Sequence, residues 1–173
     1  MRHKLTIRQP LANDSRLLTE MVNKSVSLHR PWVFAPRTPK DFSIYLKRYQ
    51  EPDQFSYLIL TQEPQSQLVG VVNLSNIIWG NFANAFLGYY ASIDFVGQGY
   101  MAEGMMMVIH EAFQKHNLHR LEANIQPENH NSIKLVKKLG FEKEGFSPEY
   151  LHIGGKWQDH ERWAIRKSSQ PRP

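Results

Sequence analysis

The sequence predicts an α/β protein in which helices flank one mixed sheet. Segments rich in β-branched and aromatic residues alternate with amphipathic segments in the order β-α-α-β-β-β-α-β-α-β-β. The amphipathic segment 100–116 separates two strands, as a crossover helix between parallel neighbours does. A length of 173 residues is typical of one domain. We therefore expect about seven strands and about four helices in a single domain, 1–166, followed by a disordered tail, 167–173.

The first half of the chain is predicted to contain two helices and four strands. A cluster of capping residues, 12–15, precedes apolar residues at helical spacing, which predict the first helix. Thr38 is expected to cap the second helix, and Pro39 to occupy its first position. An aromatic loop punctuated by prolines, 29–36, lies between the two helices. The strands are expected at 5–8, 55–60, 68–78 and 83–93.

The second half is predicted to alternate helices with strands. Methionine and aliphatic side chains fall on one face of a helix over 100–116. A further helix is expected over 129–139, with Gly140 at its end. The remaining strands are expected at 121–125, 145–153 and 161–165.

Composition restricts the possible functions. The chain has no cysteine, which excludes disulfides, cysteine nucleophiles and thiolate metal sites, and its histidines show no metal-ligand spacing, so no metal is expected. No apolar run approaches the ~20 residues of a membrane span, and we recognise no signal peptide, so we expect a cytoplasmic protein. The net charge of +5 favours anionic partners such as phosphorylated cofactors, although many cytoplasmic proteins are mildly basic without special purpose.

A glycine turn precedes the longest predicted helix. Gly97 and Gly99 lie between the strand 83–93 and the helix 100–116, where backbone N–H groups and the helix N-terminus favour an anion such as pyrophosphate. The motif is weak alone, because it lacks the third glycine of a dinucleotide fingerprint and the ending of a P-loop. A tight turn without a ligand is the alternative interpretation.

Three later segments join this turn in a recognisable set. Asn129 and Ser132 occupy the first turn of a predicted helix, which ends in Leu139-Gly140-Phe141. Glu149-Tyr150-Leu151 and Gly155-Lys156-Trp157-Gln158-Asp159-His160 follow. Together with the turn 97–103, these segments resemble the GNAT acetyltransferases, and most closely the ribosomal-protein N-terminal acetyltransferases of RimJ/RimL type. One departure is Asp94, which stands where the superfamily often has Gln or Arg.

The resemblance implies a GNAT fold and acetyl-CoA as the cofactor. Such a fold has one mixed, mostly antiparallel sheet, with a V-shaped splay between the strands 87–93 and 121–125. The pantetheine arm is expected in this gap and the pyrophosphate at the glycine turn. Lys134, Lys137 and Lys138 could meet the ribose phosphate, and a solvated helix face is the alternative interpretation of these lysines. The expected cofactor-binding residues are Tyr90, Ala91, Ser92, Ile93, Val96, Gly97, Gln98, Gly99, Tyr100, Met101, Asn129, Ser132 and Lys137.

The chemistry requires a neutral amine, an oxyanion site and a departing thiolate. Ser132, or a tyrosine or water near it, could protonate the thiolate, and backbone N–H groups near Tyr90 could stabilise the oxyanion. An α-amino group has a pKa of about 7.7–8.0 and lysine about 10.4, so a weak carboxylate base serves an N-terminal amine more easily. Glu149 is the candidate base, because it matches the acidic position of the family. The expected substrate-binding residues are Trp32, Tyr89, Tyr150 and Asp159, and His160 is expected with Asp159 at the rim of the pocket.

The sequence leaves three functions open. The first is acetylation of a protein N-terminus, as on a ribosomal protein, and the second is acetylation of a small amine such as an antibiotic, polyamine or amino acid. The third is a noncatalytic module that binds CoA. Neither a membrane nor direct nucleic-acid contact is expected, and the protein is expected to be a monomer or a homodimer.

Overall fold

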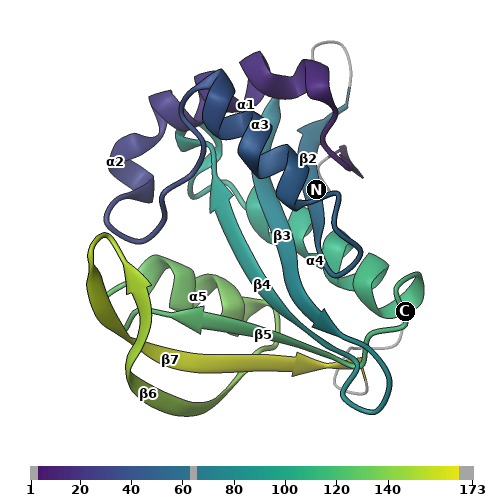
Figure 1. Ribbon diagram of the computed structural model, residues 1–173, viewed down its shortest axis with the longest axis vertical. Helices are drawn as coiled ribbons and strands as arrows, with labels where there is room; N and C mark the ends of the chain where they lie inside the picture. Colours follow the sequence, from purple (N-terminus) through teal and green to yellow (C-terminus); the bar gives the residue numbers. More distant parts are fainter. Residues whose placement is uncertain (1–3, 63–65, 168–173) are drawn as a thin grey trace.

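One mixed sheet organises the described residues, 4–62 and 66–167, of the computed structural model (Figure 1). The strand order is β1-β2-β3-β4-β5-β7-β6, and all neighbouring pairs are antiparallel except β4 and β5. This confirms the predicted mixed, mostly antiparallel sheet. The strands are β1 (Leu5–Arg8), β2 (Phe55–Thr61), β3 (Leu68–Ile78), β4 (Asn84–Ala91), β5 (Arg120–Ile125), β6 (Glu142–Ile153) and β7 (Lys156–Arg166).

The helices agree with the predicted order but number five in the described chain rather than about four. They are α1 (Ser15–Lys24), α2 (Val26–His29), α3 (Pro39–Arg48), α4 (Tyr100–Gln114) and α5 (His130–Lys138). The extra helix arises because Ser25 divides the first predicted one. Its N–H bonds to the carbonyls of Met21 and Val22, and its hydroxyl accepts the N–H of Ile93 at 3.0 Å. Two 3-10 turns, η1 (Ala12–Asp14) and η2 (Ile93–Phe95), complete the elements.

The predicted helix caps are present. Thr38 Oγ1 accepts the N–H of Asp41 at 3.1 Å, the Asp41 carboxylate accepts the N–H of Thr38, and Pro39 begins α3. Asn129 Oδ1 accepts the N–H of Ser132 at 3.2 Å. Each bond satisfies a backbone donor that has no partner within its helix.

The sheet separates two apolar clusters. The larger cluster joins α4 and α5 to one face, and the smaller joins α1 and α3 to the other face (Figure 1). Successive side chains of β2 point to opposite faces of the sheet. Ile59 therefore belongs to the first cluster, and Leu58 and Leu60 belong to the second. Both faces of the central strands are therefore buried. Among the described helices, none has the length and apolar content to cross a bilayer.

The central strands β4 and β5 diverge along their length. They pair only from Asn84 opposite Arg120 to Phe86 opposite Glu122. Beyond this point, β4 stays paired with β3 as far as Ala91, and β5 stays paired with β7 as far as Ile125. The predicted V-shaped splay is thus present, and it leaves one edge of each strand without a neighbouring strand. Of the predicted tail, Lys167 is described and 168–173 lies outside the described residues.

Candidate active site

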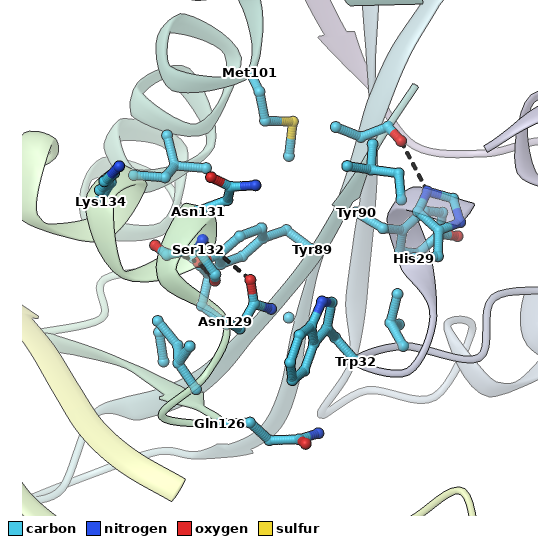
Figure 2. Close-up of a pocket in the computed structure, with 18 of the residues that line it drawn as sticks. His29, Trp32, Tyr89, Tyr90, Met101, Gln126, Asn129, Asn131, Ser132 and Lys134 are labelled. Carbon is cyan, nitrogen blue, oxygen red and sulfur yellow. Dashed lines mark hydrogen bonds between the residues drawn. The ribbon is translucent and has the colours of Figure 1, made fainter. Parts of the chain in front are cut away.

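A cavity of about 530 Å³ occupies the gap between β4 and β5 (Figure 2). The two strands, the glycine turn, the start of α5, the α2 region and the β6–β7 hairpin all contribute to its wall. Ten predicted site residues line it: Trp32, Tyr89, Tyr90, Ala91, Val96, Gly97, Gly99, Met101, Asn129 and Ser132. The splay therefore gathers residues that are as far apart as 100 positions in the sequence.

The free edge of β4 exposes backbone groups to this cavity. The N–H of Ser92 bonds to the carbonyl of Val69 on β3 at 2.7 Å, whereas the carbonyl of Ala83 accepts from His119, which precedes β5, at 2.8 Å. Successive residues of a strand direct their backbone groups to opposite edges. Tyr89 and Ala91 therefore direct theirs toward the gap, where an extended ligand could form hydrogen bonds with them.

His29 ties α2 to the end of β4. Its Nε2 donates to the carbonyl of Ala91 at 2.8 Å, and its ring meets the Tyr90 ring edge to face at 5.3 Å between centroids (Figure 2). Burial lowers the pKa of His29. Its Nδ1 is buried and has no hydrogen-bonding partner among the described residues. Our sequence analysis missed His29, because no motif marks a histidine in the aromatic loop.

The glycine turn presents the N-terminus of α4 to the cavity. Gly97 and Gly99 have φ of +76° and +88°, a region that glycine adopts without strain. Gly99 is the N-cap of α4, and a Cβ built on Gly97 would meet nothing within 4 Å. The space over the turn is therefore open to an anion.

Asp94 does not present a free charge to this turn. Its carboxylate pairs with Lys24 Nζ at 2.7 Å, which offsets the negative charge that the sequence places near the predicted pyrophosphate. Four further predicted cofactor residues support the turn and do not line the cavity. Ser92 Oγ accepts the N–H of Asp94, Ile93 bonds to Ser25, Gln98 donates to the carbonyl of Asp94, and Tyr100 packs on Phe95.

The first turn of α5 forms the opposite wall. Tyr89 Oη reaches from β4 to within 2.5 Å of Ser132 Oγ, and burial raises the pKa of Tyr89 to about 12. Lys134 and Lys138 also line the cavity, together with Asn131, which the sequence analysis did not select. Lys137 does not, because its ammonium group lies over the indole of Trp163, 5.4 Å from the ring centroid.

The β6–β7 hairpin forms a further part of the cavity wall, where the acceptor is expected. His160 is buried and lines the cavity, as do Leu151 and Ile153. The Nδ1 of His160 donates to the carbonyl of Gln158 at 2.9 Å, so the neutral imidazole carries its lone pair on Nε2, and burial lowers the pKa of this group.

The predicted residues of this hairpin lie beside the cavity and do not line it. Glu149 is exposed at a β-bulge, where its N–H bonds to Asp159 Oδ1 at 2.8 Å. Tyr150 packs against His160, with 6.1 Å between the ring centroids. His160 thus lines the cavity, whereas Glu149, Tyr150 and Asp159 lie next to its wall.

These features fit acetyl-CoA. The free edge of β4 suits the amide groups of a pantetheine arm, and the open glycine turn at a helix N-terminus suits a pyrophosphate. Lys134 and Lys138 add positive charge on the same side of the cavity. Among the described residues, no cluster of three potential metal ligands occurs.

Comparison with known proteins agrees with this geometry. The family described as "Acetyltransferase (GNAT) domain" matches residues 4–142, and the chain belongs to this family. It is therefore an acetyl-CoA-dependent N-acetyltransferase.

Several relatives resemble this chain over different lengths. A probable N-acetyltransferase, YjcK, of Bacillus subtilis is 35% identical over 73% of this chain and 69% of its own length. A [Ribosomal protein uS5]-alanine N-acetyltransferase of Escherichia coli is 38% identical over 60% of this chain, but the match spans only 54% of that enzyme. The structure of a ribosomal-protein-S5-alanine acetyltransferase from Vibrio fischeri superimposes with a TM-score of 0.82, at 26% identity, over 97% of this chain and 96% of that one.

Proposed function

We propose that the acceptor is the N-terminal α-amino group of a protein, as in the ribosomal-protein-alanine acetyltransferases. The observation that carries this proposal is the composition of the acceptor end. Trp32 and Val33 line it on one side and Leu151 and Ile153 on the other, next to the neutral imidazole of His160. Apolar walls favour the single amine of an N-terminal residue with a small side chain over a polycation, whose ammonium groups would each require a compensating partner.

The α-amine also matches the weak base that the site provides. Compared with a lysine side chain, an α-amine is easier to deprotonate by about 3–4 kcal/mol at neutral pH. We propose that the lone pair on His160 Nε2 receives the proton, either directly or through water. Glu149 is the alternative base, and it would act through water from outside the cavity wall.

The wall formed by β4 and α5 contains groups that could stabilise the oxyanion and protonate the departing thiolate. When bound, acetyl-CoA supplies a thioester whose carbonyl carbon is the electrophile. Backbone N–H groups at the free edge of β4 are available to an oxyanion. The hydroxyl pair formed by Tyr89 and Ser132 holds a proton at Tyr89 Oη, because the raised pKa of Tyr89 keeps it protonated at neutral pH. We propose that this pair donates a proton to the departing sulfur.

A small-amine acceptor is the second candidate. A spermidine N(1)-acetyltransferase of Vibrio cholerae is 24% identical over 97% of this chain. A polyamine would bind in the same cavity. It differs from a protein N-terminus because no peptide group follows its amine.

Release of CoA separates the two candidates. The assay compares a peptide that begins with Ala and contains one Lys, the same peptide with a blocked N-terminus, and spermidine. Because of the difference in amine pKa, we expect turnover of the free peptide to exceed that of the blocked peptide by at least about a hundredfold. Faster turnover of spermidine than of the free peptide would contradict the proposal.

A further inference from the structure

A second cavity, of about 540 Å³, adjoins the active-site cavity. It lies between α3 and the loop 30–37, which in Figure 1 runs from α2 to α3. Val33 and Tyr90 contribute to the walls of both cavities. The two cavities therefore meet at these two side chains, and an acceptor chain with its first residue in the active site would reach the second cavity by crossing this shared wall.

Three arginines give the second cavity a positive charge. Arg30, Arg37 and Arg48 line it with a single acidic residue, Asp41. The carboxylate of Asp41 is already engaged as the cap of α3, where it accepts the N–H groups of Thr38 and Arg37 at 3.1 and 3.3 Å. Within residues 4–62 and 66–167, no carboxylate forms an ion pair with any of the three arginines. Three guanidinium groups and one carboxylate give the lining a net positive charge, and of the three arginines Arg37 also donates its Nε–H to Asn23 Oδ1 at 2.9 Å.

Aromatic rings and buried hydroxyls form the rest of the wall. The guanidinium of Arg30 lies 3.5 Å from the centroid of the Phe34 ring, and the Tyr45 and Tyr49 rings are 4.8 Å apart. Tyr45 Oη donates to Asn73 Oδ1 at 3.1 Å and also contacts Ser56 Oγ. The neighbouring Tyr90 hydroxyl is buried, and no well-formed hydrogen bond within the described chain satisfies it. The rings thus add apolar surface beside the guanidinium groups, whereas the Tyr45 and Tyr90 hydroxyls are buried behind it.

We propose that this cavity receives the acceptor segment that follows the α-amine, and that it selects acceptors with a carboxylate there. The inference rests on the proposed N-terminal acceptor. A guanidinium binds a carboxylate through two parallel hydrogen bonds, and such charge-assisted bonds are stronger than neutral ones. The carboxylate comes from an Asp or Glu side chain within a few residues of the N-terminus.

The test uses C-terminally amidated peptides that begin with Ala. Glu is placed in turn at positions 2 to 5, and each peptide has a counterpart with Gln at the same position. At one position or more, we expect kcat/KM for the Glu peptide to exceed that for its Gln counterpart about tenfold. A free-acid Ala-Gly-Gly peptide, compared with its amide, distinguishes a terminal carboxylate from a side-chain one.

Variants then assign the preference to the cavity. Arg48→Gln and the double variant Arg37→Gln/Arg48→Gln should reduce the Glu-to-Gln ratio to about one. Lys47→Gln is the matched control, because Lys47 adjoins Arg48 on α3 but does not line the cavity, and it should keep the ratio.

Each remaining outcome has a distinct meaning. Equal rates for Glu and Gln peptides at all positions, a preference that survives both arginine variants, or a preference only for the free terminal carboxylate would overturn this inference and leave the N-terminal acceptor intact. Failure of all these peptides to be acetylated would overturn the proposed function itself.

Discussion

The hydroxyl of Tyr89 lies 2.5 Å from Ser132 Oγ, and this contact joins the free edge of β4 to the first turn of α5. Asn129 fixes the same turn through its bond to the N–H of Ser132. The cap that begins α5 therefore also positions the serine against the tyrosine in the wall of the cavity.

Removal of the Tyr89 hydroxyl should slow the reaction. We expect Tyr89→Phe to lower kcat at least about tenfold, because a proton donor for the departing sulfur is lost, while the Kd for acetyl-CoA changes little. Tyr57→Phe is the control, since the Tyr57 hydroxyl is also hydrogen-bonded, to His116 at 2.6 Å, but lies outside the cavity. Single-turnover kinetics and calorimetric titration measure the two quantities, and equal loss in both variants would exclude a specific role for Tyr89.

Paired variants identify the base. If His160 Nε2 accepts the proton, His160→Gln should lower kcat/KM about tenfold or more, and Glu149→Gln should have a small effect. The burial that lowers the pKa of His160 keeps it neutral at neutral pH, so its protonation should reduce the rate only below about pH 6.5. The reverse pattern, with a large loss only in Glu149→Gln, would assign the base to the carboxylate.

A side chain at the glycine turn should weaken cofactor binding. Gly97→Val places a side chain in the open space over the α4 N-terminus and strains a residue with φ of +76°. We expect a loss of affinity for acetyl-CoA of about tenfold or more. Gly80→Val is a matched control, because Gly80 has φ of +73°, also faces open space, and lies away from the cavity. Equal affinity of the two folded variants for acetyl-CoA would contradict a phosphate site at this turn.

Lysines of α5 should differ in their effect on cofactor affinity. Lys134→Gln and Lys138→Gln should each weaken acetyl-CoA binding and reduce its dependence on ionic strength, because both side chains line the cavity. Lys137→Gln should have a smaller effect, since Lys137 packs over Trp163. Titrations at low and high salt give the comparison, and a dominant effect of Lys137 would show that the cofactor lies along a different face of α5.

Stability should fall in mild acid. Burial lowers the pKa of His29, His116 and His160 from 6.5, so the unfolded chain binds more protons than the folded one below that pH. The stability is fully present above about pH 6.5 and is lost as the pH falls toward the lowered values. We expect Tm to decrease between pH 7.5 and 5.5, and His29→Gln to reduce this decrease. The exposed His110→Gln should not, and an equal effect of the two variants would contradict the assignment.

Much of this architecture could be predicted from local sequence patterns. The caps at Thr38 and Asn129 depend on neighbouring residues only, and the glycine turn follows from two residues that tolerate positive φ. The break at Ser25 could not be predicted, because it depends on a bond to Ile93, 68 residues away.

The site was less predictable for the same reason. His29 reaches Ala91 only after the helix break turns α2 toward β4, and no local spacing marks that contact. Glu149 matches an acidic family position, but a β-bulge and the bond to Asp159 leave it outside the cavity wall. Lys137 and Lys138 are adjacent in sequence, and only packing against Trp163 separates their roles.

The proposed reaction transfers acetyl to an N-terminal α-amine. Tandem mass spectrometry can locate the acetyl group on a peptide that begins with Ala and contains an internal Lys, after incubation with the enzyme and acetyl-CoA. We predict acetylation of the α-amine with the lysine unmodified. Acetylation of the lysine alone, or of added spermidine in preference to the peptide, would contradict it.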